Sequence, residues 1–199
     1  LEALDHAIGL ENPKAAKPKL AIARAQGVLD SVTLAISNAI FAASFLEQNT
    51  KIMRRLVDAH DVAELAKTDC PPDLGPRIEL TSHHKSVFVN MDPVLVRLAL
   101  RNLLDNALKY SSPQSLIQFC ILQREDLLGT SFTVTSQLAA ADLLDETIFS
   151  RRARGEGAEG RGSGLGLYLV KKVAEAHGGS VSFSVHDNAT VTFDLFLPD

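Results

Sequence analysis

The chain has 199 residues, of which 46% are hydrophobic and 22% are charged, and its formal net charge is −4 at pH 7. This is the composition of a soluble globular protein with room for one full domain or two small ones. The negative balance argues against a general nucleic-acid-binding protein, which would carry a basic surface. The two cysteines, Cys70 and Cys120, lie far apart and in no metal-ligand spacing, which favours a reduced, cytosolic protein.

Residues 19–67 are predicted to be helical almost throughout. Apolar residues recur there at helical spacing, and prolines are absent between Pro18 and Pro71. The longest apolar run, residues 34–46, is shorter than the roughly 20 residues of a membrane helix, so we expect a buried helix. Interruptions such as Gly27 favour two helices packed as an antiparallel hairpin. Such a hairpin has too much apolar surface to stand alone, and a second copy would complete a four-helix bundle.

After Pro76 the pattern changes to short alternating stretches, which predict strands at residues 77–81, 87–91, 115–122, 131–135, 180–186 and 190–197. Two helices lie between these strands. One begins with Asp92 as N-cap and Pro93 at the first helical position, and the other follows Gly162. The mixture predicts an α+β fold, in which helices cover one face of a sheet. We therefore expect a helical hairpin in residues 1–68 and a second domain in residues 69–199.

The first of these helices carries a polar stripe. Asn102, Asn106 and Lys109 share one face, because residues four and seven apart lie above one another on a helix, and Tyr110 lies at the edge of the stripe. Asparagine is a poor helix former, so a merely solvated face is a weak explanation for two of them in mid-helix. A carboxamide oxygen together with phosphate oxygens would suit Mg²⁺, and the Lys109 ammonium could approach the phosphates.

A glycine-rich stretch, residues 162–167, precedes the second helix. Glycines at a helix start let backbone amides approach an anion, and the helix dipole favours phosphate there. The preceding residues 150–161 are rich in glycine and arginine, which on its own indicates no more than a solvated loop.

Together, and in this order, residues 102–110 and 162–179 resemble the nucleotide-binding half of a sensor histidine kinase, within the wider ATPase family that includes gyrase and MutL. The resemblance implies a two-layer α/β sandwich of the Bergerat type that binds ATP and Mg²⁺. It implies that Asn106 holds Mg²⁺ and that Asn102 assists there. Lys109 and Tyr110 would contact phosphate and sugar. The glycine-rich stretch and the arginine-rich lid before it would supply the remaining nucleotide contacts, namely Arg151, Arg152, Arg154, Arg161, Gly162, Gly164, Leu165, Gly166 and Leu167.

The family's first glycine box, Asp-x-Gly-x-Gly, is altered in this chain. Counting from Val134 puts Ser136 at the position of the aspartate, whereas counting back from Phe149 puts Thr135 there. In either case the acidic partner of the adenine amino group is replaced by a hydroxyl. A neutral hydrogen bond is roughly half as strong as a charge-assisted one, so the altered box weakens the case for adenine recognition and leaves weak or absent binding open as an alternative.

The candidate phosphoacceptor is His6. The family has an acidic residue after this histidine and a proline shortly after, whereas here Ala7 follows and Pro13 lies two residues too far on. In favour of His6, residues 54–58 resemble the end of the second hairpin helix and lie at about the expected distance along the chain from His6.

The resemblance therefore implies the cytoplasmic core of a divergent two-component sensor histidine kinase. Its reaction would be ATP-dependent autophosphorylation on a histidine, followed by transfer to the receiver domain of a response regulator. The expected partners are a second copy, bound through the hairpin, and that receiver domain, with no nucleic acid and with membrane contact only through segments outside this chain. One alternative is a pseudokinase, a dimeric signalling scaffold with little or no ATP binding. A gyrase- or MutL-type ATPase is disfavoured by the short chain and the kinase-like His177-Gly-Gly.

Overall fold

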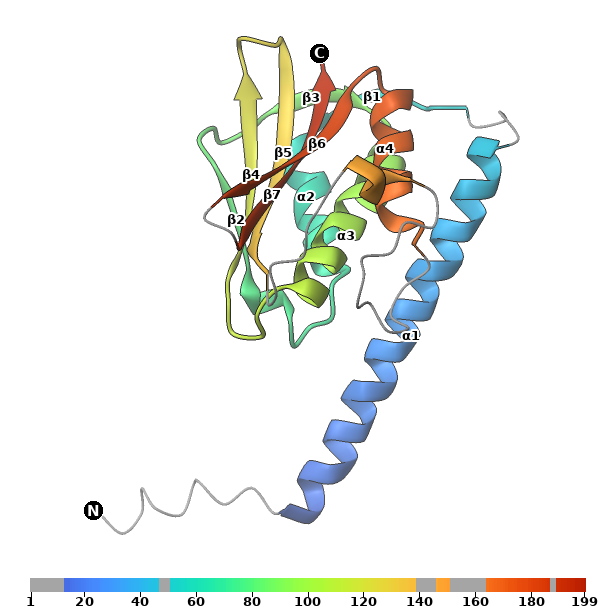
Figure 1. Cartoon of the computed structure of the whole chain (residues 1–199), viewed down its shortest axis with the longest axis vertical. Helices are drawn as coiled ribbons and strands as arrows, with labels where there is room; N and C mark the ends of the chain where they lie inside the picture. The colour runs from blue at the N-terminus through green and yellow to red at the C-terminus, as the bar shows by residue number, and fades with distance from the viewer. Residues whose placement is uncertain (1–12, 47–50, 139–145, 151–163, 187–188) are drawn as a thin grey trace, which may run out of the picture.

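The computed structural model describes residues 13–46, 51–138, 146–150, 164–186 and 189–199. A long helix, α1 (Pro13–Leu46), lies against an α/β domain and projects well beyond it (Figure 1). The other helices are α2 (Ala59–Thr68), α3 (Pro93–Tyr110) and α4 (Gly166–Ala176), with short 3-10 turns η1 (Gly75–Arg77) and η2 (Glu146–Phe149).

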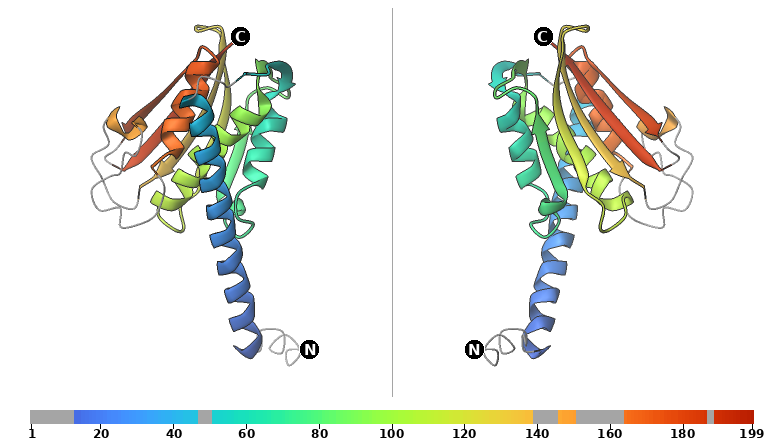
Figure 2. Two further views of the ribbon diagram at one scale, coloured as in Figure 1. Left: turned by 90° about the vertical axis from the view of Figure 1, so that its right-hand side faces the viewer. Right: turned by 90° about the vertical axis from the view of Figure 1, so that its left-hand side faces the viewer.

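The domain is built on a five-stranded sheet in the order β2-β4-β5-β7-β6. Its strands are β2 (Ile78–Ser82), β4 (Ile117–Arg124), β5 (Gly129–Gln137), β6 (Ser180–His186) and β7 (Thr190–Pro198). β2 runs parallel to β4, and the other neighbours are antiparallel. Helices α2, α3 and α4 lie on one face of this sheet (Figure 2). The predicted α+β sandwich is confirmed.

The core lies between the sheet and the helices. Phe132 and Val134 of β5 are fully buried on the helix side, while Thr133 and Thr135 alternate to the outer face. Leu100, Leu103 and Leu104 of α3 are fully buried, and so are Leu169, Val170 and Val173 of α4. The predicted cap of α3 is present, because the Asp92 carboxylate accepts from the amides of Val94 and Leu95 at 3.0 and 3.2 Å.

The described residues 51–68 do not form the second helix of the predicted hairpin. Residues 55–58 form a strand, β1 (Arg55–Asp58), which pairs antiparallel with β3 (Phe88–Met91). Asp58 then caps α2, accepting from the amide of His60 at 3.0 Å. Val62, Ala63 and Ala66 of α2 are buried in the same core as α3. Residues 55–68 therefore belong to the α/β domain, and the boundary predicted at residue 68 lies too late.

Within a single chain, the apolar part of α1 is largely exposed, so the expected burial would need a partner. Of the side chains described on α1, only Asn38 and Ala42 are buried. A separate stripe of α1 is apolar and exposed, at Val28, Leu29, Val32, Ile36 and Ile40. By length and composition alone, the window Gly27–Ser44 could cross a membrane, but Asn38 in its middle is hydrogen-bonded to α3.

His177 joins the end of α4 to the start of α3. Its ring is 2% exposed, Nε2 accepts from the Asp92 amide at 3.0 Å, and Nδ1 donates to the carbonyl of Val173 at 2.7 Å. This pair of bonds requires the neutral tautomer protonated on Nδ1. Burial lowers the pKa of His177 below its ordinary value of 6.5.

Acidification below pH 6.5 should therefore reduce the free energy of unfolding. The unfolded histidine takes up a proton near its ordinary pKa of 6.5, whereas the folded one is protonated only at a lower pH. Acid therefore stabilises the unfolded state relative to the folded state. Urea unfolding on both sides of this pH measures the loss. His177→Phe should remove this part of the pH dependence, while His186→Phe, at an exposed residue, should retain it. Equal pH dependence in both variants would contradict the buried neutral ring.

Candidate nucleotide site

The two sequence motifs meet in space. Gly166 is the first residue of α4, and a methyl group built on it would lie only 2.7 Å from the side-chain oxygen Oδ1 of Asn102 on α3. The start of α4 therefore lies directly against the asparagine face of α3. Glycine is needed at this position because any side chain would overlap the Asn102 carboxamide.

The start of α4 has the properties of an anion site. Gly164 has a positive φ of 63°, a left-handed conformation that favours glycine, and it turns the chain into the helix. The N-cap residue Leu165 makes no side-chain capping bond. The first amides of an α-helix have no intrahelical partner, and the helix dipole adds partial positive charge there. Leu167 packs partly buried against the core and fixes the first turn.

Asn102 is buried, with 4% of its surface exposed. Its Nδ2 donates to the carbonyl of Leu98 at 2.9 Å. Its carboxamide also exchanges two hydrogen bonds with Asn38 of α1. The residue predicted to assist Mg²⁺ is therefore held between α1, its own helix and the start of α4.

The other predicted residues of α3 lie one and two turns further on. Asn106 is half-buried, and Tyr110 at the helix end is 44% exposed. The Lys109 ammonium forms an ion pair with Asp105 at 2.6 Å. A phosphate group at this face would share Lys109 with the Asp105 carboxylate, so the two residues set the local charge together.

The first glycine box can be placed by the register of β5. Ser136 pairs with Val191 of β7, is 4% exposed and faces the helices with Phe132 and Val134. Thr135 faces the other way, where its hydroxyl lies 2.9 Å from that of Thr192. Of the two alignments open from the sequence, the one that uses Ser136 places its hydroxyl on the side of α3 and α4.

Several predicted residues lie outside the described part of the chain. They are the candidate phosphoacceptor His6, the lid arginines Arg151, Arg152, Arg154 and Arg161, and the first glycine of the motif, Gly162. Gly164, Leu165, Gly166 and Leu167 of the same motif are described.

Two buried polar residues, one on α1 and one on α3, were missed by the sequence analysis. One is Asn38, whose only signal is that it is polar within an apolar run. The other is Arg101, which is 6% exposed and whose Nη1 has no hydrogen-bond partner among the described residues. Arg101 lies near Asp105 and the thiol of Cys70, whose pKa is raised by burial. The interior side of α3 is therefore charged as well as its exposed stripe.

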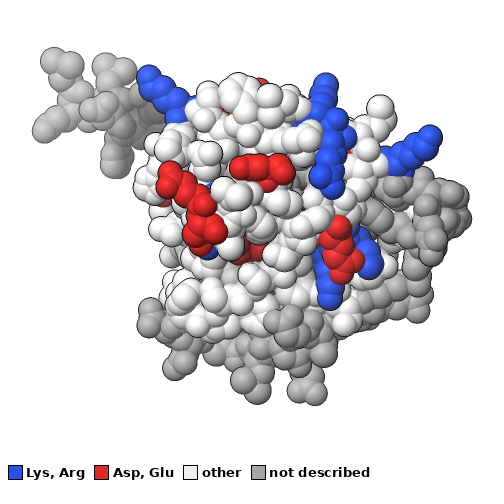
Figure 3. Space-filling view, turned by 90° about the horizontal axis from the view of Figure 1, so that it is seen from above, with Lys and Arg blue, Asp and Glu red and all other residues white. Residues whose placement is uncertain are grey.

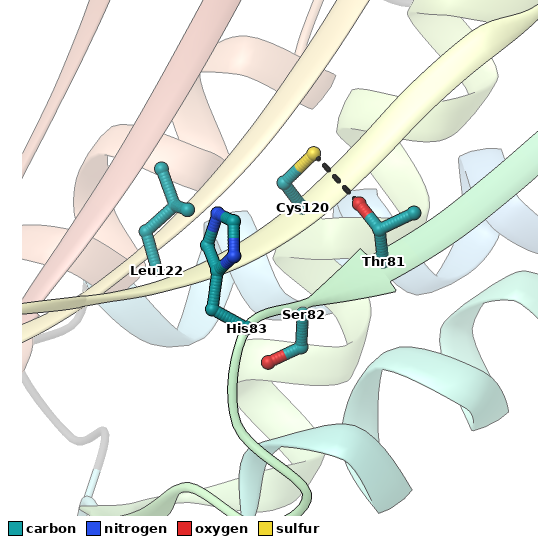
Figure 4. Close-up of a pocket in the computed structure, with 5 residues that line it drawn as sticks. All are labelled: Thr81, Ser82, His83, Cys120 and Leu122. Carbon is teal, nitrogen blue, oxygen red and sulfur yellow. Dashed lines mark hydrogen bonds between the residues drawn. The ribbon is translucent and has the colours of Figure 1, made fainter.

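Outside the region between α3 and α4, the described surface has fewer features of a binding site. Figure 3 shows lysine and arginine interspersed with acidic side chains on the face seen from above, without a field of one sign. A small hollow of about 80 Å³ lies at the edge of the sheet between β2 and β4, where the hydroxyl of Thr81 is 3.1 Å from the Cys120 sulfur (Figure 4).

Within the described residues, no group of three or more His, Cys, Asp or Glu side chains could hold a metal ion. An oxygen-preferring ion would depend on amide and phosphate oxygens instead.

Comparisons with known proteins show the family of the chain. The model of the family described as histidine kinase-, DNA gyrase B-, and HSP90-like ATPase matches residues 91–199. The chain is 37% identical over 151 residues to the sensor-like histidine kinase SenX3 of Mycobacterium tuberculosis, covering 74% of this chain and 33% of that protein. It is 35% identical over 130 residues to the sensor protein QseC of Salmonella typhimurium, covering 64% of this chain and 26% of that protein.

Among solved structures, the cytoplasmic segment of histidine kinase QseC aligns with a TM-score of 0.60 at 17% identity, over 83% of this chain and 94% of that one. This likeness shows the fold. The chain spans about a quarter to a third of the length of the two curated relatives, so it corresponds to one part of such proteins.

Proposed function

Because the chain belongs to the family of histidine kinase-, DNA gyrase B- and HSP90-like ATPases, we propose that it is the cytoplasmic core of a divergent sensor histidine kinase that binds Mg²⁺-ATP between α3 and α4. The observation that carries this proposal is the contact between the two motifs, where Gly166 meets Asn102. The amides at the start of α4, the carboxamides of α3 and the Lys109 ammonium would then line one site. Such a set of groups suits the phosphate chain of a nucleotide.

Each residue has a role that its position supports. The first amides of α4 would bind phosphate oxygens, and Lys109 would add a cation at the same face. Asn106 would offer its carboxamide oxygen to Mg²⁺, which supplies charge neutralisation for the phosphates when bound. Tyr110 at the end of α3 would contact the sugar, and Ser136 would accept one hydrogen bond from the base.

The finer proposal is autophosphorylation on a histidine and transfer to a response-regulator receiver domain. His6 is our candidate acceptor, although residues 54–58 were expected to mark its partner helix and residues 55–58 of them form β1 instead. Ala7 supplies no carboxylate as base, and general-base help is worth about 10²–10⁴-fold, so transfer should be slow.

The test is to incubate the chain with ATP labelled on its γ-phosphate and to look for an acid-labile, alkali-stable label. We expect a slowly formed label that His6→Gln abolishes. A label that survives this substitution would place the acceptor elsewhere.

A specific observation favours the alternative of a pseudokinase scaffold. Ser136, which we propose to meet the base, is not an acid, and a neutral acceptor binds the adenine amino group more weakly. Nucleotide binding without any acid-labile label would support this alternative over the kinase.

We also propose that the chain forms a homodimer through α1 rather than through a complete hairpin of its own. The five exposed apolar residues of α1 fall within about a third of the helix circumference at 3.6 residues per turn. The buried Asn38 and Ala42 lie outside this stripe. An apolar stripe of this size favours a partner helix. The proposed kinase core would lie in the cytoplasm. Light scattering that reports a monomer at tens of micromolar would contradict the dimer.

A further inference from the structure

The contact between α1 and the nucleotide face centres on two asparagines. The Nδ2 of Asn38 donates to Oδ1 of Asn102 at 2.7 Å, and the Nδ2 of Asn102 donates back to Oδ1 of Asn38 at 2.9 Å. Each residue is only 4% exposed. Two carboxamides thus satisfy each other in a place that water does not reach, which fixes the position of α1 along α3.

Few other described side chains of α1 take part in the contact. Ala42 is buried and Phe41 packs partly buried against the domain core, while the exposed apolar stripe of the helix points to solvent. A helix whose described side chains bury so little surface against the domain is expected to detach at a modest cost in free energy. Breaking one partner of the amide pair would leave the other buried and unsatisfied, so the pair is the specific part of the attachment.

This attachment also closes off Asn102. Its Oδ1 faces the start of α4, 2.7 Å from where a methyl group on Gly166 would lie, and it accepts from Asn38. Mg²⁺ usually keeps several waters when it binds a protein. A hydrated ion cannot approach an oxygen that is enclosed between two helices, so Asn102 is withheld from the metal while α1 is docked.

We propose that Asn38 is a latch residue, and that docking of α1 through Asn38 competes with the engagement of Mg²⁺-nucleotide by Asn102. This rests on the nucleotide site proposed above and adds its control by α1. Coupling between two sites is reciprocal, so nucleotide should release α1, and releasing α1 should tighten nucleotide binding.

The test compares the wild-type chain with Asn38→Asp by calorimetric titration of Mg-ADP. An aspartate cannot donate to Oδ1 of Asn102 and would bring a buried charge against it, so α1 should undock. We expect Asn38→Asp to bind Mg-ADP about tenfold more tightly, within the usual range of allosteric coupling. Thr33→Asp is the matched control, because it adds the same charge to α1 at an exposed residue and should bind like the wild type.

Hydrogen exchange gives the reciprocal readout on the same proteins. Saturating Mg-ADP should speed exchange of the amides of residues 34–42 in the wild type, and Asn38→Asp should show fast exchange there without nucleotide. Equal affinity of wild type and Asn38→Asp, or weaker binding by Asn38→Asp, would contradict the proposed latch but not the proposed nucleotide site. Binding by none of the three proteins at millimolar Mg-ADP would overturn the nucleotide site and the latch together.

Discussion

Gly179→Ala should destabilise the α/β domain by about 3 kcal/mol or more. A methyl group on Gly179 would overlap the carbonyl oxygen of Phe196 and lie 3.2 Å from Cα of Leu197. Both atoms belong to the backbone of β7, so no side-chain rotation relieves the clash. Gly179 also donates its amide to the carbonyl of Ala174 at 2.9 Å in the turn that ends α4, which prevents the turn from moving away.

Gly75→Ala is the matched control for this substitution. A methyl group on Gly75 would meet no atom within 4 Å, so the same chemical change should be neutral or add about 0.4–1 kcal/mol through the unfolded chain. Urea unfolding of both variants measures the difference. Similar losses in the two variants would contradict the close passage of the turn after α4 against β7.

Lys109→Ala should weaken the binding of Mg-ATP by about 10- to 100-fold, because a hydrogen bond to a charged group contributes about 1.5–3 kcal/mol. The loss has two parts. The ammonium is removed from the phosphate side, and the Asp105 carboxylate, which it holds at 2.6 Å, is left as an unpaired negative charge on the same face. Calorimetric titration with Mg-ATP gives the affinity.

Two further variants separate these parts. The double variant Asp105→Asn with Lys109→Ala should recover some of the affinity, because it removes the repulsion that the single variant leaves. Lys172→Ala is the matched control, since Lys172 forms a similar ion pair at 2.6 Å, with Glu175 on the exposed side of α4. If Lys172→Ala weakened binding as much as Lys109→Ala, the assignment of Lys109 to the site would be wrong.

Local signals in the sequence were sufficient to predict α3 and most of the sheet. Asp92 and Pro93 mark the start of α3 by capping chemistry alone, and the strands show their alternation within a few residues. The signal for the start of α4 is equally local, because Gly164 adopts a left-handed conformation that favours glycine. In all of these the information lies within one turn or one strand of the residue concerned.

The second hairpin helix was mispredicted because β1 has only four residues and lies directly before α2. A run this short has no period that distinguishes a strand from a helix, and the partner of β1 is β3, about thirty residues further on. Asn38 could not be assigned a role for a similar reason. Its pairing with Asn102 depends on where α1 docks, which the sequence of α1 does not state.

The choice between Ser136 and Thr135 shows the same limit on a smaller scale. Counting from either neighbouring landmark is consistent with the sequence, and a shift of one residue moves a side chain to the other face of the sheet. The pairing of Ser136 with Val191 settles the face, because both are buried on the helix side.

The central claim is that Asn106, Lys109 and the start of α4 form a site for Mg²⁺-ATP, and calorimetric titration of the wild-type chain with ATP tests it most directly. We expect saturable binding with one nucleotide per chain when Mg²⁺ is present, and clearly weaker binding when the metal is chelated. A wild-type chain that takes up no ATP at millimolar concentration with Mg²⁺ would contradict the claim.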